Sequence, residues 1–135
     1  MTEADVLAAA RRWAEAWRAA WRNHDVELLR PFYAKDVEFR SQPFREPQAP
    51  ADYAAWAFQD EAEARVWFAE PRVVGTDRAA VEYWGVSIPR HGTTETIAGV
   101  ALLRFGPDGR VVEQRDYWNA AEGAVEPYEG WGSGG

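Results

Sequence analysis

Asp116 is the residue of this chain that most needs a chemical explanation. It lies in VVEQRDYWNAAEG (residues 111–123), which we predict to contain the last strand, between an arginine and two large aromatic side chains. A carboxylate on the covered face of a sheet is costly unless it is paired, hydrogen-bonded or used in catalysis. An apolar pocket would raise its pKa from about 3.9 by up to several units and make it a better base near neutral pH. Such a base suits proton transfer next to a carbonyl group.

The preceding hairpin predicts which way Asp116 points. If GPDG (residues 106–109) is a four-residue loop, counting back from it places Gly99 opposite Asp116 and Ile97 opposite Trp118. Asp116 then shares the inner face of the sheet with apolar side chains. The alternative to a chemical role is that Asp116 only accepts hydrogen bonds from neighbouring donors and anchors the sheet to a helix.

The surroundings of Asp116 predict a ligand pocket. Gly99 and Ala101 are small and leave space beside the carboxylate, which is typical of a binding cavity. Groups that could polarise a substrate oxygen are the side chains of Gln114, Ser41 and Tyr33 and the indole nitrogens of Trp17 or Trp56. We predict Asp116 as the catalytic residue and a pocket lined by Trp17, Tyr33, Phe39, Ser41, Trp56, Ile97, Gly99, Ala101, Gln114 and Trp118.

Three helices are expected to cover this pocket. They span residues 3–25, 25–33 and 51–64, with a strand around residues 37–40 between the second and the third. The first helix is the longest and carries an apolar stripe at spacings of three and four, formed by Val6, Ala10, Trp13, Trp17 and Trp21. Most of this stripe is expected to fill the space between helix and sheet.

From residue 63 the pattern changes to strands. Four β-rich runs are separated by short turns and predict an antiparallel meander, at residues 64–76, 78–89, 93–105 and 110–120. The order of helices and strands predicts an α+β fold in which the helices cover one face of a curved sheet. The facing of Glu82 stays open, because a three-residue turn at residues 90–92 turns it outward and a two- or four-residue turn inward.

Composition excludes several classes of protein. The chain has 135 residues, 47% of them hydrophobic, with eight Trp and no Cys, so one globular domain without thiolate chemistry is expected. No apolar run approaches a membrane span of about 20 residues. A net charge of -7 argues against a nucleic-acid partner. MTEADVLAAARRW lacks the cationic start and apolar centre of a signal peptide, so a cytoplasmic location is expected. No spacing of His, Asp and Glu indicates a metal site, and we expect no metal and no cofactor.

Two segments carry a family resemblance over about residues 4 to 121. HDVELLRPFYAKDVEF, which enters the first strand, and GVALLRFGPDGRVVEQRDYWN, which closes the sheet, resemble the nuclear transport factor 2-like superfamily and, within it, the SnoaL-like proteins. The resemblance implies a cone-shaped fold in which a curved, antiparallel-rich sheet wraps around three N-terminal helices and encloses an apolar pocket. It does not imply one reaction, because this scaffold serves many functions.

Matching positions narrows the chemistry that the resemblance implies. Ser41, Trp17 and Ala101 stand where the ketosteroid isomerases of this fold have their base and oxyanion hole, so that chemistry is absent. Gly99 and Ala101 likewise lack the Arg and Asp of the limonene epoxide hydrolases. Asp116 occupies what looks like the place of the acid/base Asp in the SnoaL-type polyketide cyclases, which use no metal or cofactor. Their helper His has no counterpart here.

Three hypotheses remain open after the sequence. The first is a cofactor-independent enzyme, an isomerase, cyclase or hydratase/hydrolase, that uses Asp116 on a hydrophobic carbonyl compound. The second is a pocket that binds a small apolar ligand without catalysis, and the third is a dimeric scaffold. We expect a homodimer through the convex face of the sheet, as proteins that look like this commonly form. We also expect one domain over residues 1–121 and a flexible, Gly-rich tail over residues 122–135.

Overall fold

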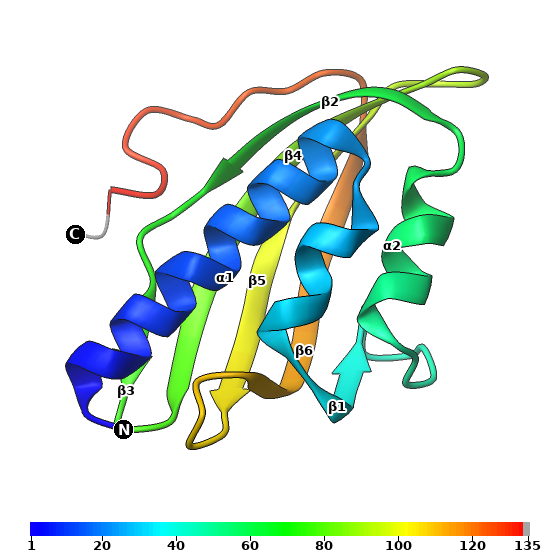
Figure 1. Cartoon of the computed structure of the whole chain (residues 1–135). Coiled ribbons are helices and arrows are strands. Elements are labelled where there is room, and N and C mark those ends of the chain that lie inside the picture. Colours follow the sequence, from blue (N-terminus) through cyan, green and yellow to red (C-terminus); the bar gives the residue numbers. More distant parts are fainter. Residues whose placement is uncertain (134–135) are drawn as a thin grey trace.

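The computed structural model describes residues 1–133 as helices packed on one face of a six-stranded sheet (Figure 1). In chain order the elements are α1 (Glu3–Asn23), the 3-10 helix η1 (Val26–Phe32), β1 (Tyr33–Arg40), α2 (Pro50–Phe58), β2 (Glu61–Phe68), β3 (Arg72–Val74), β4 (Arg78–Pro89), β5 (Glu95–Phe105) and β6 (Val111–Glu122). The predicted α+β class and the three N-terminal helices are confirmed. In the part of the chain described, no helix is long and apolar enough to span a membrane.

Helix α1 forms where its sequence predicts it. Thr2 caps its N-terminus in a capping box with Asp5, each side chain accepting a hydrogen bond from the backbone of the other. The apolar stripe faces the sheet, and Trp13 and Trp17 at its centre are 2% and 8% exposed. The helix ends at His24, whose left-handed backbone (φ 53°) sends the chain into η1.

The strands follow the order β1-β6-β5-β4-β2, and β3 pairs separately with β4. All these pairs are antiparallel except β1 with β6, which is parallel. The sheet is therefore mixed. Strand β6 lies between β5 and β1, so its inner side chains reach the space beneath α1 from the middle of the sheet (Figure 1).

The register predicted for the last hairpin is wrong by two residues on β6. Gly99 lies opposite Trp118, and Asp116 lies opposite Ala101. The turn is one residue longer than predicted, so Phe105 pairs with Val111, and a bulge between Phe105 and Arg104 adds the second residue. Beyond the bulge, a shift of two leaves the side chains of β6 on their predicted face, since the period of a strand is two. Asp116 therefore still points inward.

Two predicted boundaries also differ from the structure. The third helix ends at Phe58 rather than at residue 64, and Glu61 already begins β2. The run predicted over residues 64–76 is two strands, β2 and β3, because the chain breaks pairing at the Pro71 segment. These differences matter for the site, because they bring Glu61 into the sheet beside the C-terminus of α1.

Residues 123–133 run along the outer face of the sheet, the face turned away from α1 (Figure 1). Trp84 of β4 donates a hydrogen bond to the Val125 carbonyl at 2.7 Å and packs against the rings of Tyr128 and Trp131. Thr96 adds two hydrogen bonds to this segment, one of them with the backbone N–H of Val125. Tyr128 and Trp131 thus lie on the outer face and not over the opening of the pocket.

Candidate functional site

A cavity of about 470 Å³ lies between the inner face of the sheet and helices α1 and α2. Six of the residues predicted for the catalytic site and pocket line it: Asp116, Trp17, Trp56, Ile97, Gln114 and Trp118. Its other lining residues are Trp13, Trp21, Arg45, Tyr53, Ala57, Phe58, Gln59, Asp60, Glu61, Phe68, Tyr83, Ser87, Pro89 and Glu95. The wall is mainly aromatic, with a few polar groups at separate places, as is usual for small-molecule sites.

Asp116 accepts two hydrogen bonds in the wall of this cavity. The Tyr83 hydroxyl donates to Oδ2 at 3.1 Å, and the Gln114 amide donates to Oδ1 at 2.9 Å. Removal from water dominates over these two bonds and raises the pKa of Asp116 to about 7. The part of the side chain that stays accessible faces the cavity, where a ligand would meet the carboxyl group.

Asp116 also changes the phenols around it. Burial first, and then the carboxylate charge, raise the pKa of Tyr83 well above its usual value. Tyr83 therefore stays protonated and keeps donating to Asp116. The orientation of the Gln114 amide is fixed by Tyr33. The amide oxygen accepts from the Tyr33 hydroxyl at 2.5 Å, which leaves the amide nitrogen to donate to Asp116.

Five of the residues predicted in the pocket lie outside its wall. The Tyr33 hydroxyl is buried beneath α1, where it accepts from the indoles of Trp13 and Trp17 at 2.9 and 2.7 Å. Ser41 has no exposed surface, and its carbonyl accepts from Trp118 at 2.6 Å. The other three are Phe39, Gly99 and Ala101. Phe39 and Ala101 have no exposed surface. Trp118 packs against Gly99 and lies between it and the cavity.

Arg45 and Tyr53 belong to the wall and were missed. The Arg45 guanidinium, from the loop between β1 and α2, lies 5.5 and 5.4 Å from the ring centres of Trp56 and Trp118. The Tyr53 phenol of α2 is buried, and desolvation raises its pKa to about 12, with Asp116 adding to the rise and Arg45 opposing it. Tyr53 therefore places a neutral hydroxyl donor near Asp116, and Arg45 adds a cation beside Tyr53 in the same wall.

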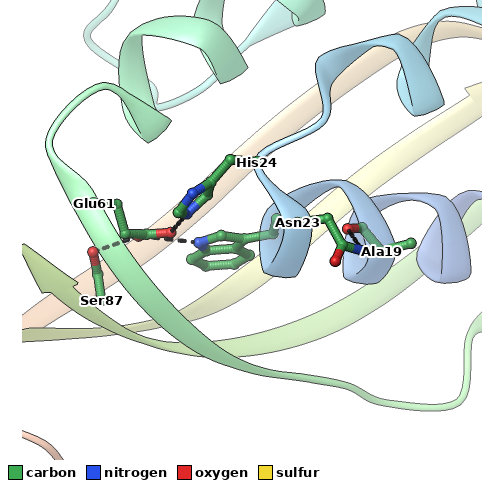
Figure 2. A network of polar contacts seen from close by, with 6 residues as sticks. Ala19, Asn23, His24, Glu61 and Ser87 are labelled. Atoms are coloured by element: carbon green, nitrogen blue, oxygen red, sulfur yellow. Dashed lines mark hydrogen bonds and ion pairs between the residues drawn. The ribbon is translucent and has the colours of Figure 1, made fainter.

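A second carboxylate, Glu61, lies elsewhere in the wall. Figure 2 shows its side chain between His24 and Ser87. The His24 Nε2 lies 2.8 Å from Oε1, and the Trp21 indole and the Ser87 hydroxyl donate to Oε2 at 3.2 and 2.5 Å. Glu61 is 5% exposed. His24 follows α1 but is not an exposed turn residue, because its ring is held by Glu61 and packs on Phe58.

The sequence offered signals for some of these residues. Tyr83 shares the inner face of β4 with Val81 and Gly85. Glu82, between them, therefore faces outward. Arg45 lies in the proline-containing loop between β1 and α2, and Tyr53 follows that loop. The loop has no periodic pattern from which the direction of its side chains could be predicted. Glu61 was hidden because DEAEA reads as the polar end of a helix.

The sequence between Ala14 and Gln114 matches the family model of the SnoaL-like domain, which covers three quarters of the chain. The chain belongs to the SnoaL-like family. No curated protein sequence matches it. Among solved structures, an NTF2-like protein of unknown function from Exiguobacterium sp. 255-15 is similar, with a TM-score of 0.66 and 14% identity over 82% of this chain and 98% of that chain. The protein RV0760c from Mycobacterium tuberculosis is similar with a TM-score of 0.67 and 20% identity, over 91% of this chain and 99% of that one.

These likenesses confirm the nuclear transport factor 2-like fold that the sequence resembles. At 14% and 20% identity, these likenesses are evidence for the fold alone. The chemistry of this SnoaL-like chain has to be argued from its own cavity, where a half-ionised carboxyl group, a neutral phenol and a guanidinium lie within one aromatic wall.

Proposed function

We propose that this SnoaL-like protein is an acid/base enzyme that uses Asp116 on an apolar, carbonyl-bearing small molecule. The observation that carries the proposal is the Asp116 carboxyl, whose pKa is raised to about 7 in the wall of an aromatic cavity. A general base works best when its pKa lies near the working pH, because it is then both ionised and able to take a proton.

The wall supports a defined sequence of proton movements. Ionised Asp116 takes a proton from the carbon next to the carbonyl group, and the electron pair of that bond moves onto the carbonyl oxygen. Tyr53 and Arg45, which line the same cavity, are the donors that we assign to the resulting oxyanion. Protonated Asp116 then returns the proton to the far carbon of a double bond conjugated with the enolate, which gives isomerisation. In ring closure the enolate carbon instead attacks a second carbonyl group of the same molecule, and Asp116 returns its proton to the alkoxide that forms.

The test is exchange of the α-protons of an apolar ketone, such as β-tetralone, for deuterium. The native protein accelerates exchange, and Asp116→Asn lowers the rate by about a hundred- to ten-thousand-fold. Asn keeps the packing, because its oxygen accepts from Gln114 and its nitrogen donates to the Tyr83 hydroxyl. Asp36→Asn, a change of an exposed carboxylate, is the matched control and leaves the rate unchanged.

Tyr53→Phe and Arg45→Met test the oxyanion step separately. Loss of a donor that acts only in the transition state lowers kcat and leaves KM nearly constant. A rise in KM alone would assign these two residues to ligand binding. Exchange that persists undiminished in Asp116→Asn would remove the enzymatic proposal and leave the second candidate, a pocket that binds a small apolar ligand without catalysis.

We also infer a homodimer through the outer face of β5 and β6. Tyr117 is 43% exposed there, next to the half-buried Val100, Leu102 and Val112, and the segment at residues 123–133 covers only the neighbouring part of the face around Trp84. An isologous contact would bury this apolar strip. The cytoplasmic location expected from the sequence stays a prediction.

A further inference from the structure

Glu61 forms a second polar end of the cavity, apart from Asp116. Each carboxylate accepts a hydrogen bond from a side chain of β4: Asp116 from Tyr83, and Glu61 from Ser87. Tyr83 and Ser87 are four residues apart and share the inner face of this strand, which separates them by about 13 Å at about 3.3 Å per residue. A ligand that fills the cavity therefore meets one carboxyl group at each end.

The hydrogen bonds of Glu61 leave it able to accept one more. A carboxylate has about four acceptor positions, and Trp21, His24 and Ser87 occupy three. Glu61 accepts only, so each of these partners must donate, and a neutral imidazole can do so through Nε2. Because Glu61 lines the cavity, its remaining position is open to a donor on a ligand.

The character of the wall favours a positively charged donor. Nine of the lining side chains are aromatic, and four are carboxylic acids, at Asp60, Glu61, Glu95 and Asp116. Among residues 1–133 Arg45 is the one lysine or arginine in the lining, and it is stacked between Trp56 and Trp118. Aromatic rings around a buried carboxylate bind organic ammonium groups through cation–π attraction and a charge-assisted hydrogen bond. An anionic ligand would be repelled at the same end.

We propose that the cavity takes an apolar amine, with its ammonium group on Glu61 and its hydrocarbon body extended toward Asp116. This deepens the proposed function by naming the substrate class, an amine that carries its reactive carbonyl group at the end of the hydrocarbon body far from the nitrogen. Selection of the amine rests on Glu61, and turnover rests on Asp116, so the two parts are tested by different variants.

The first test compares three probes with the same carbon skeleton: phenylbutylamine, phenylbutanol and phenylbutyrate. Titration calorimetry of the whole chain is expected to give at least about tenfold tighter binding of the amine than of the carboxylate, with the alcohol between them. Glu61→Gln removes the charge in the same shape and abolishes the preference for the amine. Glu95→Gln, a change of an exposed lining carboxylate, is the matched control and keeps most of the preference.

A second measurement on the unaltered protein covers the case in which Glu61→Gln does not fold. Nuclear Overhauser contacts from the methylene next to the nitrogen of phenylbutylamine should reach the Trp21 ring. Contacts from that methylene to Tyr83 or Trp118 instead would place the ammonium group at Asp116 and overturn the proposal. Equal binding of all three probes, or tightest binding of phenylbutyrate, would overturn it as well.

The two proposals fail independently. Asp116→Asn is expected to lose turnover and to keep the preference for phenylbutylamine. If the preference is present but no ketone is turned over, the amine site stands and the enzymatic proposal falls. If Asp116 catalyses exchange but Glu61→Gln leaves the three affinities unchanged, the reverse holds.

Discussion

Tyr83 of β4 donates its hydroxyl to Asp116 of β6 at 3.1 Å, across the strand that lies between them. The contact is possible because β5 has only Gly99 and Ala101 opposite these residues, so no side chain stands in the way. One hydrogen bond from Tyr83 and one from Gln114 are not enough to offset the burial of Asp116, whose pKa stays raised at about 7. The site therefore keeps a carboxyl group that is half-protonated near neutral pH.

The first prediction is a loss of stability as the pH rises from about 4 to about 7. The unfolded chain loses the Asp116 proton near pH 3.8, whereas the folded chain keeps it up to about pH 7. Between these values the folded state binds more protons, so raising the pH lowers the free energy of unfolding, by about 4 kcal/mol in total from this group. Below the lower value Asp116 contributes no pH dependence.

Urea unfolding of native protein and Asp116→Asn across this range measures the effect. The variant lacks the titrating group, so its free energy of unfolding should not fall with pH through this site. Relative to the native protein, the variant should therefore become more stable as the pH rises. A difference that is constant between about pH 4 and pH 8 would mean that Asp116 has an ordinary pKa.

Tyr33→Phe should destabilise the fold, because the Tyr33 hydroxyl, which lies outside the cavity wall, holds three side chains that line it. The Tyr33 hydroxyl accepts from Trp13 and Trp17 and donates to Gln114, and its removal leaves the Trp17 indole without its buried acceptor. The expected loss is about 2 to 3 kcal/mol in the free energy of unfolding. Tyr128→Phe, at a ring that is 66% exposed, is the control and should change stability by less than about 0.5 kcal/mol.

Alanine at Gly99 and at Gly85 should act differently. A Cβ on Gly99 would meet the backbone oxygen of Tyr117 and the Cβ of Trp118, which cannot move away, at less than 3.0 Å. A Cβ on Gly85 would meet only the far end of the Trp21 ring, which can rotate. Gly99→Ala should therefore cost about 3 kcal/mol or more and Gly85→Ala nearer 1 kcal/mol. Thermal unfolding of both variants decides the order, and equal losses would contradict the packing described.

Tyr117→Glu should convert the inferred homodimer to monomer. A charge in the centre of an apolar contact is desolvated without a partner, while on the free outer face it would be harmless. Sedimentation velocity at matched concentrations compares the variant with native protein, and Glu113→Gln serves as a control on the same strand. A native protein that sediments as a monomer would remove the dimer.

The sequence predicted the facing of Asp116 but not its neighbours. Facing depends only on parity along the strand, so it survived the two-residue shift, of which the longer turn and the bulge near Phe105 each cause one residue. The partners of Asp116 depend on the actual register and on how Gln114 is held from Tyr33, a contact across 81 residues of sequence. Val111 lies fully buried opposite Phe105, because the turn is one residue longer than the four-residue loop predicted.

The contact between Glu61 and His24 at the second polar end of the cavity could not be predicted from patterns in the sequence. Glu61 meets His24 only because α2 stops at Phe58 and because His24 adopts a left-handed backbone at the end of α1. Neither feature has a periodic signal in the sequence. The apolar stripe of α1, in contrast, was predicted in full, because helix period and burial there follow from local spacing.

The carbon-detected NMR titration of the Asp116 carboxyl group tests the central claim most directly. The account predicts an apparent pKa of about 7 in the free protein, and a further rise in Tyr83→Phe, where one hydrogen bond to the carboxylate is lost. A pKa at or below about 4 would show that Asp116 is solvated or fully compensated, and it would contradict its role as the base.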